Sequence, residues 1–536
     1  MRRMLMTSAV MAICGAGVGW AAGCQDMAAQ APAGVLLTAQ DTQVDGVDVC
    51  QLHGTMAQRT GQDGRAYALR FELNLPRDWN GNYVHQFNGG NDGEVKPATG
   101  ALKAGTGGQS PLARGYAVVS SDAGHAGDMA PDMGLAGGAV FGFDFEARQM
   151  YGYKAVAVLD PVARDLVQGY YGADIARSYG IGCSNGGRHA MVAASRMPAA
   201  FDGLLAGAPG YRLPKAALQH ALDVQQFHAI TGDLATAYTP QDLTAVGDAI
   251  LAACDGLDGL EDGLIQDSAA CQAQFDPATL ADVLQPHQAQ ALRNVMRGTQ
   301  SDGAPYYSDW AWDNGIAGSN WRMWKLQSPI PPWDHKPIIA VMGAASLAQV
   351  FTVPPTKVVG EPAALEDYLL RFDLATQAGQ VEASSDIYPE SPMQVMSPPG
   401  SEDPHLQAFR DAGGKMILFH GVADPVFSAL DTQAYAQKLL ANTDGDSAQM
   451  LRYYPVPGMT HCSGGPGLDK FDLFTALEHW VEDGTAPQAV IATARPDNDE
   501  TPASLANAAR PLCPQPLVAR YIGGNPDDGA SFSCVE

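Results

Sequence analysis

Ser184 lies at the centre of the pattern Gly182-Cys-Ser-Asn-Gly186, whose residue types suit a turn that presents a nucleophilic serine. Gly-x-Ser-x-Gly places the serine at the apex of a sharp strand-to-helix turn, and the glycines tolerate backbone crowding there. Residues 177–182 are short and partly aromatic or β-branched, whereas residues 187–196 are alanine-rich and free of proline. Glycine supplies 59 of 536 residues, so the pattern also arises by chance. The order of strand, turn and helix favours the nucleophile.

A serine hydroxyl becomes nucleophilic when a histidine takes its proton and a carboxylate orients that histidine. On a doubly wound hydrolase sheet the chain order is serine, acid, histidine. An apolar run at residues 413–424 ends in a loop bearing Asp424, and a later strand leads to His461. Asp431 is the nearest rival to Asp424. We predict that Ser184 is the nucleophile, His461 the base and Asp424 the orienting acid.

The cysteines suggest a second link between the serine and the histidine. Eight remain after Cys14 in the N-terminal segment is set aside, and an even number in an exported protein indicates disulfides, although eight cysteines allow 105 pairings. Pairing sequence neighbours joins Cys24 to Cys50, Cys254 to Cys271 and Cys513 to Cys534, and leaves Cys183 with Cys462. The last bridge would tie the residue before Ser184 to the residue after His461.

The N-terminus has the form of a secretory signal peptide, residues 1–23. Arg2 and Arg3 precede an apolar run and then small residues, and the run is too short to span a membrane. We therefore expect a secreted or periplasmic protein without a membrane span. The sequence preceding Cys24 also resembles a lipoprotein cleavage site. Lipid on Cys24 is the alternative, but it would leave one odd thiol, so ordinary cleavage is favoured.

The net charge of −26 comes from 32 basic and 58 acidic residues. A strongly negative protein repels polyanions, so the charge argues against nucleic acid or an anionic membrane as a partner. It identifies no substrate, and the sequence leaves the oligomeric state open.

Strand patterns alternate with helical ones through the first part of the chain. Strands are expected at residues 66–75, 83–87, 115–121, 177–182 and 201–208, with a helix over 147–170 that is kinked at Pro161. This alternation predicts a mostly parallel sheet flanked by helices, and together with the serine turn it indicates an α/β-hydrolase fold.

The alternation fades between residues 211 and 404. We interpret this segment as a lid domain inserted into a catalytic domain formed by residues 24–210 and 405–536. The segment is rich in tryptophan, which either forms its core or walls an aromatic pocket. These tryptophans are Trp310, Trp312, Trp321, Trp324 and Trp333.

The loop Asn88-Gly-Gly-Asn-Asp-Gly93 follows the expected strand at residues 83–87. Its amides would supply one N–H of an oxyanion hole, and Asn185, directly after the nucleophile, the other. The alternative is a tight turn without this role.

Residues 254–265 place Asp255, Asp258, Glu261 and Asp262 among glycines. Carboxylates this close repel one another unless a hard cation lies between them, which favours calcium. The spacing is not that of an EF-hand, and a solvated acidic turn is the alternative.

Cys183-Ser184, Asp424 and His461-Cys462 together resemble the paired-cysteine triad of the tannase and feruloyl esterase family. The resemblance covers nearly the whole chain after the signal. Other matching motifs are Trp79-Asn-Gly81, residues 182–187, Gly207-Ala-Pro-Gly-Tyr211, the acidic loop, Phe275-Asp-Pro277, residues 458–465 and the Cys513/Cys534 tail.

The resemblance implies roles for particular residues. Gly90 and Asn185 would be the oxyanion donors. Structural Ca²⁺ would bind the side chains of Asp255, Asp258 and Asp262 and the carbonyls of Leu260 and Leu264. The substrate pocket would contain Tyr211, Leu213, Trp324, Ser346, Phe351 and Phe427.

The resemblance further implies a serine carboxylic ester hydrolase that acts on small esters of hydroxycinnamic or gallic type. Terephthalate monoester hydrolysis is the alternative, but the lid arginine that holds the free carboxylate in such enzymes is matched here by Ile338, with Lys336 nearby. Two alternatives of other classes are a catalytically silent polyphenol- or carbohydrate-binding protein and a calcium-dependent structural module.

Overall fold

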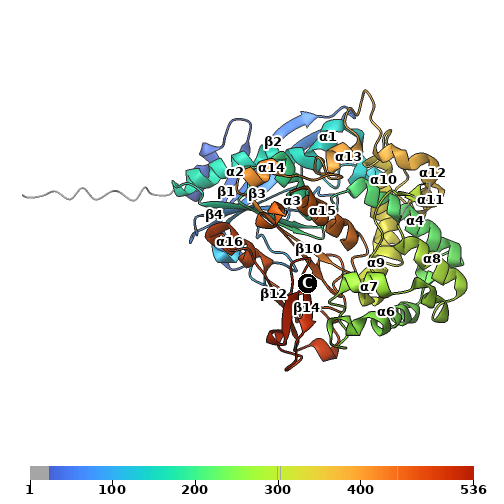
Figure 1. Cartoon of the computed structure of the whole chain (residues 1–536). Helices are drawn as coiled ribbons and strands as arrows, with labels where there is room; N and C mark the ends of the chain where they lie inside the picture. Colours follow the sequence, from blue (N-terminus) through green and yellow to red (C-terminus); the bar gives the residue numbers. More distant parts are fainter. Residues whose placement is uncertain (1–22, 299, 302–303, 444) are drawn as a thin grey trace, which may run out of the picture.

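The computed structural model describes residues 23–298, 300–301, 304–443 and 445–536, so the predicted signal peptide lies outside the described residues except for Gly23. Within the described part, the central sheet has nine strands in the order β1-β2-β3-β5-β4-β6-β7-β10-β11 (Figure 1). Pairs from β1 to β5 along this order are antiparallel, and pairs from β5 to β11 are parallel. The strands are β1 (Leu36–Val44), β2 (Val47–Thr60), β3 (Ala66–Pro76), β4 (Asn82–Phe87), β5 (Ala117–Ser121), β6 (Arg177–Cys183), β7 (Gly203–Gly207), β10 (Lys415–Gly421) and β11 (Leu451–Val456).

Successive residues of the buried strands point to opposite faces of the sheet. Leu204 and Leu418 pack on one face with helices α2 (Ala155–Tyr171), α3 (Asn185–Arg196) and α15 (Ala429–Asn442). Leu205 and Ile417 pack on the other face against α16 (Leu473–Asp483), as Figure 1 shows. The sheet is therefore covered by helices on both faces, as expected of an α/β-hydrolase fold.

The helix expected over residues 147–170 differs from the prediction in where it is irregular. It begins as α1 (Phe145–Gln149), passes through a π-helical turn, η4 (Met150–Lys154), and continues as α2 through Pro161. In the π-helical turn, a Cβ on Gly152 would lie 2.5 Å from the carbonyl oxygen of Val395. This close tertiary contact has no signature in the local sequence.

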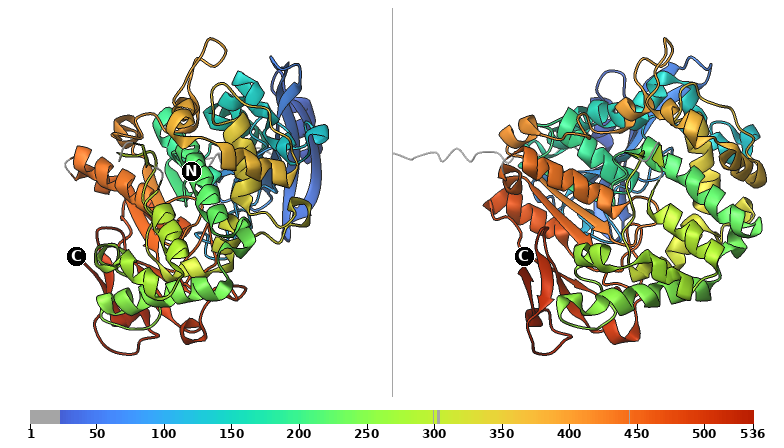
Figure 2. Two further views of the ribbon diagram at one scale, coloured as in Figure 1. Left: turned by 90° about the vertical axis from the view of Figure 1, so that its right-hand side faces the viewer. Right: turned by 45° about the vertical axis from the view of Figure 1, so that its right-hand side comes forward.

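Residues between β7 and β10 are mainly helical, and Figure 2 shows these helices, coloured green to orange, gathered on one side of the sheet. They share a buried apolar cluster that also includes residues of α1 and Phe427. The division of the chain into two domains stays a prediction. The helices are α4 (Leu213–Thr231), α5 (Leu234–Ala237), α6 (Pro240–Cys254), α7 (Ser268–Gln274), α8 (Pro286–Met296), α9 (Ser319–Lys325), α10 (Ala344–Gln349), α11 (Pro362–Arg371), α12 (Leu374–Gln377) and α13 (Pro392–Met396).

Four disulfides join the pairs expected from the sequence: Cys24–Cys50, Cys183–Cys462, Cys254–Cys271 and Cys513–Cys534. They fit a protein that folds in an oxidising compartment. Because the thiol of Cys24 is bonded to Cys50, it is not available for a lipid in this structure. Among the described residues, no helix combines the length and apolar character needed to cross a membrane.

The remaining elements follow the helical segment or lie within it. They are α14 (Gln407–Asp411), the paired strands β8 (Gln300–Ser301) and β9 (Ala304–Pro305), and near the C-terminus β12 (Val490–Thr493), β13 (Ala509–Leu512), β14 (Val518–Tyr521) and β15 (Phe532–Val535).

Candidate active site

Ser184 stands between the end of β6 and the start of α3, in a sharp turn. Its backbone has φ 65° and ψ −127°, a conformation that L-residues rarely adopt. A Cβ on Gly182 would lie 2.7 Å from the carbonyl oxygen of Phe87, so only glycine fits there. The turn is held from outside, because the Ser184 amide donates a hydrogen bond to the carbonyl of Gly207 at 2.9 Å. The surrounding strands therefore fix this strained turn.

A continuous chain of hydrogen bonds links the three predicted triad residues. His461 Nε2 lies 2.8 Å from Ser184 Oγ, and His461 Nδ1 lies 2.7 Å from Asp424 Oδ2. Ser184 follows β6, Asp424 follows β10, and His461 follows β11, so three strands of the parallel part deliver them to one edge of the sheet. This geometry suits proton transfer from the serine to the histidine.

Asp424 is fully buried and accepts several hydrogen bonds. Its Oδ1 accepts from the amides of Val426 and Phe427 at 2.7 and 3.1 Å. Burial alone would raise the pKa of Asp424, but attraction to His461 and hydrogen bonds from His420 and His461 outweigh burial and hold that pKa below its ordinary value. The carboxylate therefore stays ionised beside His461 over the physiological pH range.

The disulfide Cys183–Cys462 joins the backbone of the serine turn to that of the histidine loop. Its Cα atoms are 6.0 Å apart, and each cysteine is the immediate neighbour of a triad residue. The link constrains the distance between Ser184 and His461 covalently as well as through the sheet.

The two predicted oxyanion residues flank the serine. An added Cβ on Gly89 would lie 3.7 Å from Ser184 Cβ, which places the loop after β4 against the nucleophile. Gly90 has φ +66° and its missing side chain faces open space. Asn185 is the first residue of α3, where backbone N–H groups have no partner within the helix. Both amides are thus placed on segments next to Ser184.

Two of the predicted pocket residues contact His461. The rings of Trp324 and Phe427 meet the imidazole of His461 edge-on, with centroids 5.3 and 5.5 Å away. The hydroxyl of Ser346 donates to the side chain of Asn91, in the loop after β4, at 3.0 Å. Leu213 and Phe351 are also predicted pocket residues, and both belong to the buried cluster of the helical segment.

Tyr211 is engaged differently from the other predicted pocket residues. Its hydroxyl donates to the carboxylate of Asp431 at 3.1 Å, and Arg212 also pairs with that carboxylate. The structure does not bring the Tyr211 hydroxyl to His461. The same contacts place Asp431, the rival to Asp424, in a separate ion pair.

The five tryptophans of residues 211–404 have different surroundings. Trp310, Trp312 and Trp321 are buried in the core of the helical segment, and Trp324 is the one placed against His461. Trp333 is only partly buried at the edge of that core.

The acidic loop is folded on its own backbone. Asp255 accepts from the amide of Gly263 at 3.0 Å, Asp258 accepts from Leu260 at 2.9 Å, and Asp262 pairs with Arg510. Asp258 Oδ2 is buried without a hydrogen-bond partner, and burial, followed by repulsion from neighbouring carboxylates, raises the pKa of Asp258 to about 7. Over the described residues, no three His, Cys, Asp or Glu side chains form a metal-holding group.

Sequence reasoning missed one histidine at this site. His420 is fully buried, and its Nε2 lies 3.2 Å from Asp424 Oδ2. The spacing of four residues between His420 and Asp424, at the end of an apolar strand, is the signal that could have indicated it.

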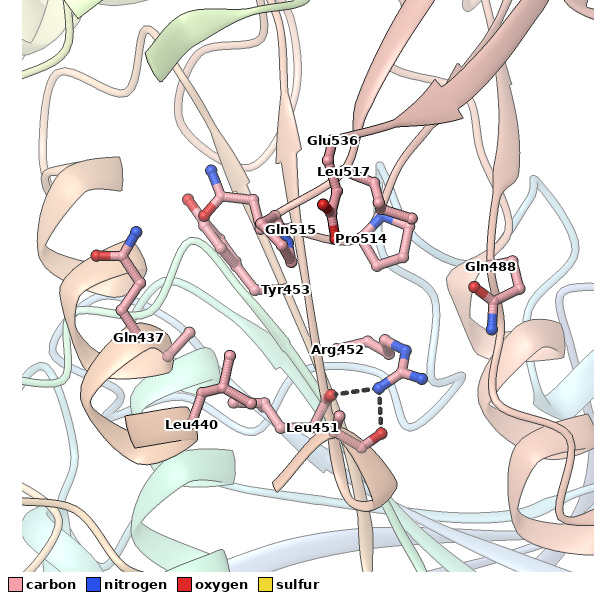
Figure 3. Close-up of a pocket in the computed structure, with 13 residues that line it drawn as sticks. Gln437, Leu440, Leu451, Arg452, Tyr453, Gln488, Pro514, Gln515, Leu517 and Glu536 are labelled. Carbon is pink, nitrogen blue, oxygen red and sulfur yellow. Dashed lines mark hydrogen bonds between the residues drawn. The ribbon is translucent and has the colours of Figure 1, made fainter. Parts of the chain in front are cut away.

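A separate cavity of ≈ 310 Å³ lies beside the edge strand β11 (Figure 3). It is lined by residues of α15, β11 and the C-terminal segment, among them Leu440, Tyr453, Pro514 and Glu536. Arg452 lies there too, but its guanidinium is bonded to the carbonyl of Leu451 at 3.0 Å. None of the triad residues lines this cavity, so it is not part of the site described above.

The fold and the site define a serine hydrolase of the α/β-hydrolase class. A family model described as tannase and feruloyl esterase matches residues 50–535. The chain therefore belongs to the tannase and feruloyl esterase family, and it is a carboxylic ester hydrolase.

Among its relatives is the mono(2-hydroxyethyl) terephthalate hydrolase of Piscinibacter sakaiensis, 37% identical over 523 residues that cover 91% of this chain and 84% of that protein. A probable feruloyl esterase of Arthroderma benhamiae is 28% identical and covers 91% of this chain and 86% of its own length. The crystal structure of feruloyl esterase B from Aspergillus oryzae superposes with a TM-score of 0.71 at 21% identity, over 96% of this chain and 99% of that chain. This last likeness supports the fold alone.

Proposed function

We propose that this protein hydrolyses esters of aromatic acids that carry neutral phenolic groups, of hydroxycinnamic or gallic type, through an acyl-enzyme on Ser184. The observation that carries the proposal is the hydrogen-bonded chain from Ser184 through His461 to Asp424, with Trp324 and Phe427 beside the imidazole. The aromatic rings would pack against the acyl group while the hydroxyl attacks its carbonyl.

Each residue of the site has a defined role in this reaction. Ser184 Oγ attacks the ester carbonyl while His461 Nε2 takes its proton. His461 then donates this proton to the leaving alcohol, and the same steps with water release the acid. Asp424 keeps His461 Nδ1 protonated and stabilises the imidazolium. The amides of Gly90 and Asn185 would bind the oxyanion.

The proposed preference for neutral acyl groups depends on the two residues of the lid that correspond to, or lie near, the position of a carboxylate-binding arginine. Ile338 is apolar and buried, and Lys336 Nζ already lies 2.5 Å from Glu366 Oε2. An ionised carboxylate placed in an apolar pocket without a cation is unfavourable by several kcal/mol. Neither residue could therefore bind the free carboxylate of a substrate, because Ile338 has no charge and Lys336 is already paired.

The second candidate is terephthalate monoester hydrolysis, because the relative of that name is 37% identical to this chain. A hydrolysis panel of methyl ferulate, methyl gallate and mono(2-hydroxyethyl) terephthalate separates the two. The proposal expects the phenolic esters to be preferred. A preference for the terephthalate ester would support the second candidate, and no hydrolysis of any of the three would oppose both.

We further propose that calcium binds the acidic loop and that the protein is exported. The unpartnered Asp258 Oδ2 fits a hard cation, because an oxygen ligand of that kind needs a positive partner. The side chains of Asp255, Asp258 and Asp262 with the carbonyls of Leu260 and Leu264 would hold the ion. Its role would be to neutralise these carboxylates. Four disulfides and the apolar N-terminus of the sequence support export.

A further inference from the structure

The carboxylate of Asp92 connects the loop that carries Gly90 to helix α3. Asp92 Oδ2 accepts a hydrogen bond from Asn185 Nδ2 at 2.8 Å, and the side chain of Asp92 is only 2% exposed. The backbone of Asp92 has φ 54°, which is unfavourable for a residue other than glycine. A buried and strained position of this kind is retained where surrounding contacts fix it.

Asn185 is held at both ends of its side-chain amide. Its Oδ1 accepts from Arg188 Nε at 2.6 Å, while its Nδ2 donates to Asp92. Arg188 is completely buried and donates to the carbonyls of Tyr151 and Gly152 at 2.9 and 2.8 Å. The start of α3 is therefore locked to the π-helical turn behind it and to the oxyanion loop in front.

Two further contacts of the loop engage its carbonyl oxygens. The hydroxyl of Tyr151 donates to the carbonyl of Gly90 at 3.1 Å, and His125 Nε2 lies 2.9 Å from the carbonyl of Asn91. These bonds orient individual peptide groups, but they come from residues outside α3. The side chain of Asp92, by contrast, is bonded to Asn185, whose backbone amide is the second proposed oxyanion donor.

The buried groups around Asp92 include one full positive charge. Burial raises the pKa of Asp92 to about 7, against the attraction of His125 and Arg188 and the bond from Asn185. His189 Nε2 lies 3.1 Å from Asp92 Oδ2, and burial lowers the pKa of His189 far below its ordinary value, so this ring is neutral. Arg188 supplies a positive charge that favours the carboxylate form of Asp92.

From this geometry we propose that Asp92 is a positioning residue of the oxyanion hole, which fixes the spacing between the Gly90 and Asn185 amides by tethering their two segments. The inference rests on the proposed function, since it assigns both amides to the oxyanion. Donors stabilise an oxyanion only within a narrow distance range, and a misplacement of about 1 Å lowers the rate about a hundredfold. A carboxylate that spans the two segments controls that distance without touching the substrate.

The test compares Asp92→Ala and Asn185→Ala, alone and combined, with the native enzyme on methyl ferulate. Asn185→Ala keeps the backbone amide and removes the other end of the tether, together with the hydrogen bond from Arg188. Each single variant should lower kcat about 10- to 100-fold with KM changed by less than about threefold, because the lost stabilisation belongs to the transition state. The double variant should be no slower than the slower single variant, because each single variant already removes the bond between Asp92 and Asn185.

A second readout uses phenylboronic acid, whose tetrahedral serine adduct needs the same donors. Its inhibition constant should rise by the factor by which kcat falls, which a loss of general stability would not cause. Asp160→Asn is the matched control, because Asp160 is also buried and lies 3.2 Å from a histidine nitrogen, His85 Nδ1, away from the triad. This control should keep the native kcat. If Asp92→Ala does not fold, Asp92→Asn, with the same volume and one acceptor oxygen, should show a smaller loss of the same kind.

Two failures are distinguishable. A native enzyme that hydrolyses no aromatic ester would overturn the proposed function, and the inference with it. A native enzyme that is active, with Asp92 and Asn185 variants that retain native kcat and native boronate affinity, would overturn the inference alone. Additive losses in the double variant would also contradict a shared tether.

Discussion

His420 Nε2 lies 3.2 Å from Asp424 Oδ2, the same oxygen that His461 Nδ1 contacts. The other nitrogen of His420 lies 2.9 Å from the hydroxyl of Thr432. When that hydroxyl donates to Nδ1, the ring presents an Nε2 proton to the carboxylate. Asp424 is then held from one side by His420 while it orients His461 from the other.

We predict that His420→Ala lowers kcat for methyl ferulate about tenfold or more, because an unanchored Asp424 holds His461 less well. His420→Asn should lose less, since its amide can still donate toward Asp424. His479 is an exposed histidine paired with Asp483, and His479→Ala is the control. Steady-state kinetics on folded protein check this prediction, and native kcat in His420→Ala would contradict it.

Stability should depend on pH through Asp424. The pKa of this buried group is held below its ordinary value by His461 and His420, although burial opposes the shift. A lowered native pKa means that the stabilisation is present above the unfolded pKa of about 3.9 and is lost as pH falls through the native pKa. The difference in the free energy of unfolding between the native enzyme and Asp424→Asn should be on the order of 1 kcal/mol larger at pH 7 than at pH 3. Urea unfolding at both values measures it, and an equal difference would oppose the account.

Substrate choice should change with the residue at position 338. The native enzyme should have kcat/KM for methyl ferulate or methyl gallate at least about tenfold above that for mono(2-hydroxyethyl) terephthalate, or about 1.4 kcal/mol in transition-state stabilisation. Ile338→Arg should narrow this ratio by supplying a cation for the free carboxylate. Ile338→Met, which adds no charge, should leave the ratio unchanged. A preference of the native enzyme for the terephthalate ester would contradict this prediction and would mean that another cation binds the free carboxylate of that substrate.

Calcium should raise the melting temperature. Binding to the folded state alone stabilises by about 2.7 kcal/mol at a hundredfold excess over Kd. Thermal melts with calcium and with a chelator should therefore differ for the native protein and not for Asp258→Asn. The exposed carboxylate of Asp282 lies further along the chain, so Asp282→Asn should keep the difference. Identical native melts, together with no calcium in the purified protein, would mean that the acidic loop is only a solvated turn.

Much of the parallel half of the sheet could be predicted from sequence, because its strands are short apolar runs bounded by glycine or proline. The first strand could not. Leu36–Val44 alternates only between exposed and partly exposed positions, so it carries little of the apolar signal by which strands are recognised. It pairs with β2 through a short hairpin, and its inward residues Leu37 and Ala39 are only partly buried against the core.

The triad was accessible from sequence because chain order and the cysteine neighbours constrain it. The supporting contacts were not. The bond between Asp92 and Asn185 joins residues 93 positions apart, and the hydroxyl of Tyr211 bonds to Asp431 across 220 positions. Contacts of this range depend on how the strands are ordered, which local patterns do not reveal.

The central claim is that Ser184 carries the acyl group. Peptide mass spectrometry after reaction with a serine-reactive fluorophosphonate tests it most directly, with Ser184→Ala as the control. We expect one adduct, on the peptide that contains Ser184, together with loss of esterase activity in proportion to labelling. The Ser184→Ala variant should take up no label, keep its fold, and lose several orders of magnitude in turnover, since triad members act as a unit. Labelling of another serine with loss of activity, or full activity in Ser184→Ala, would contradict the account.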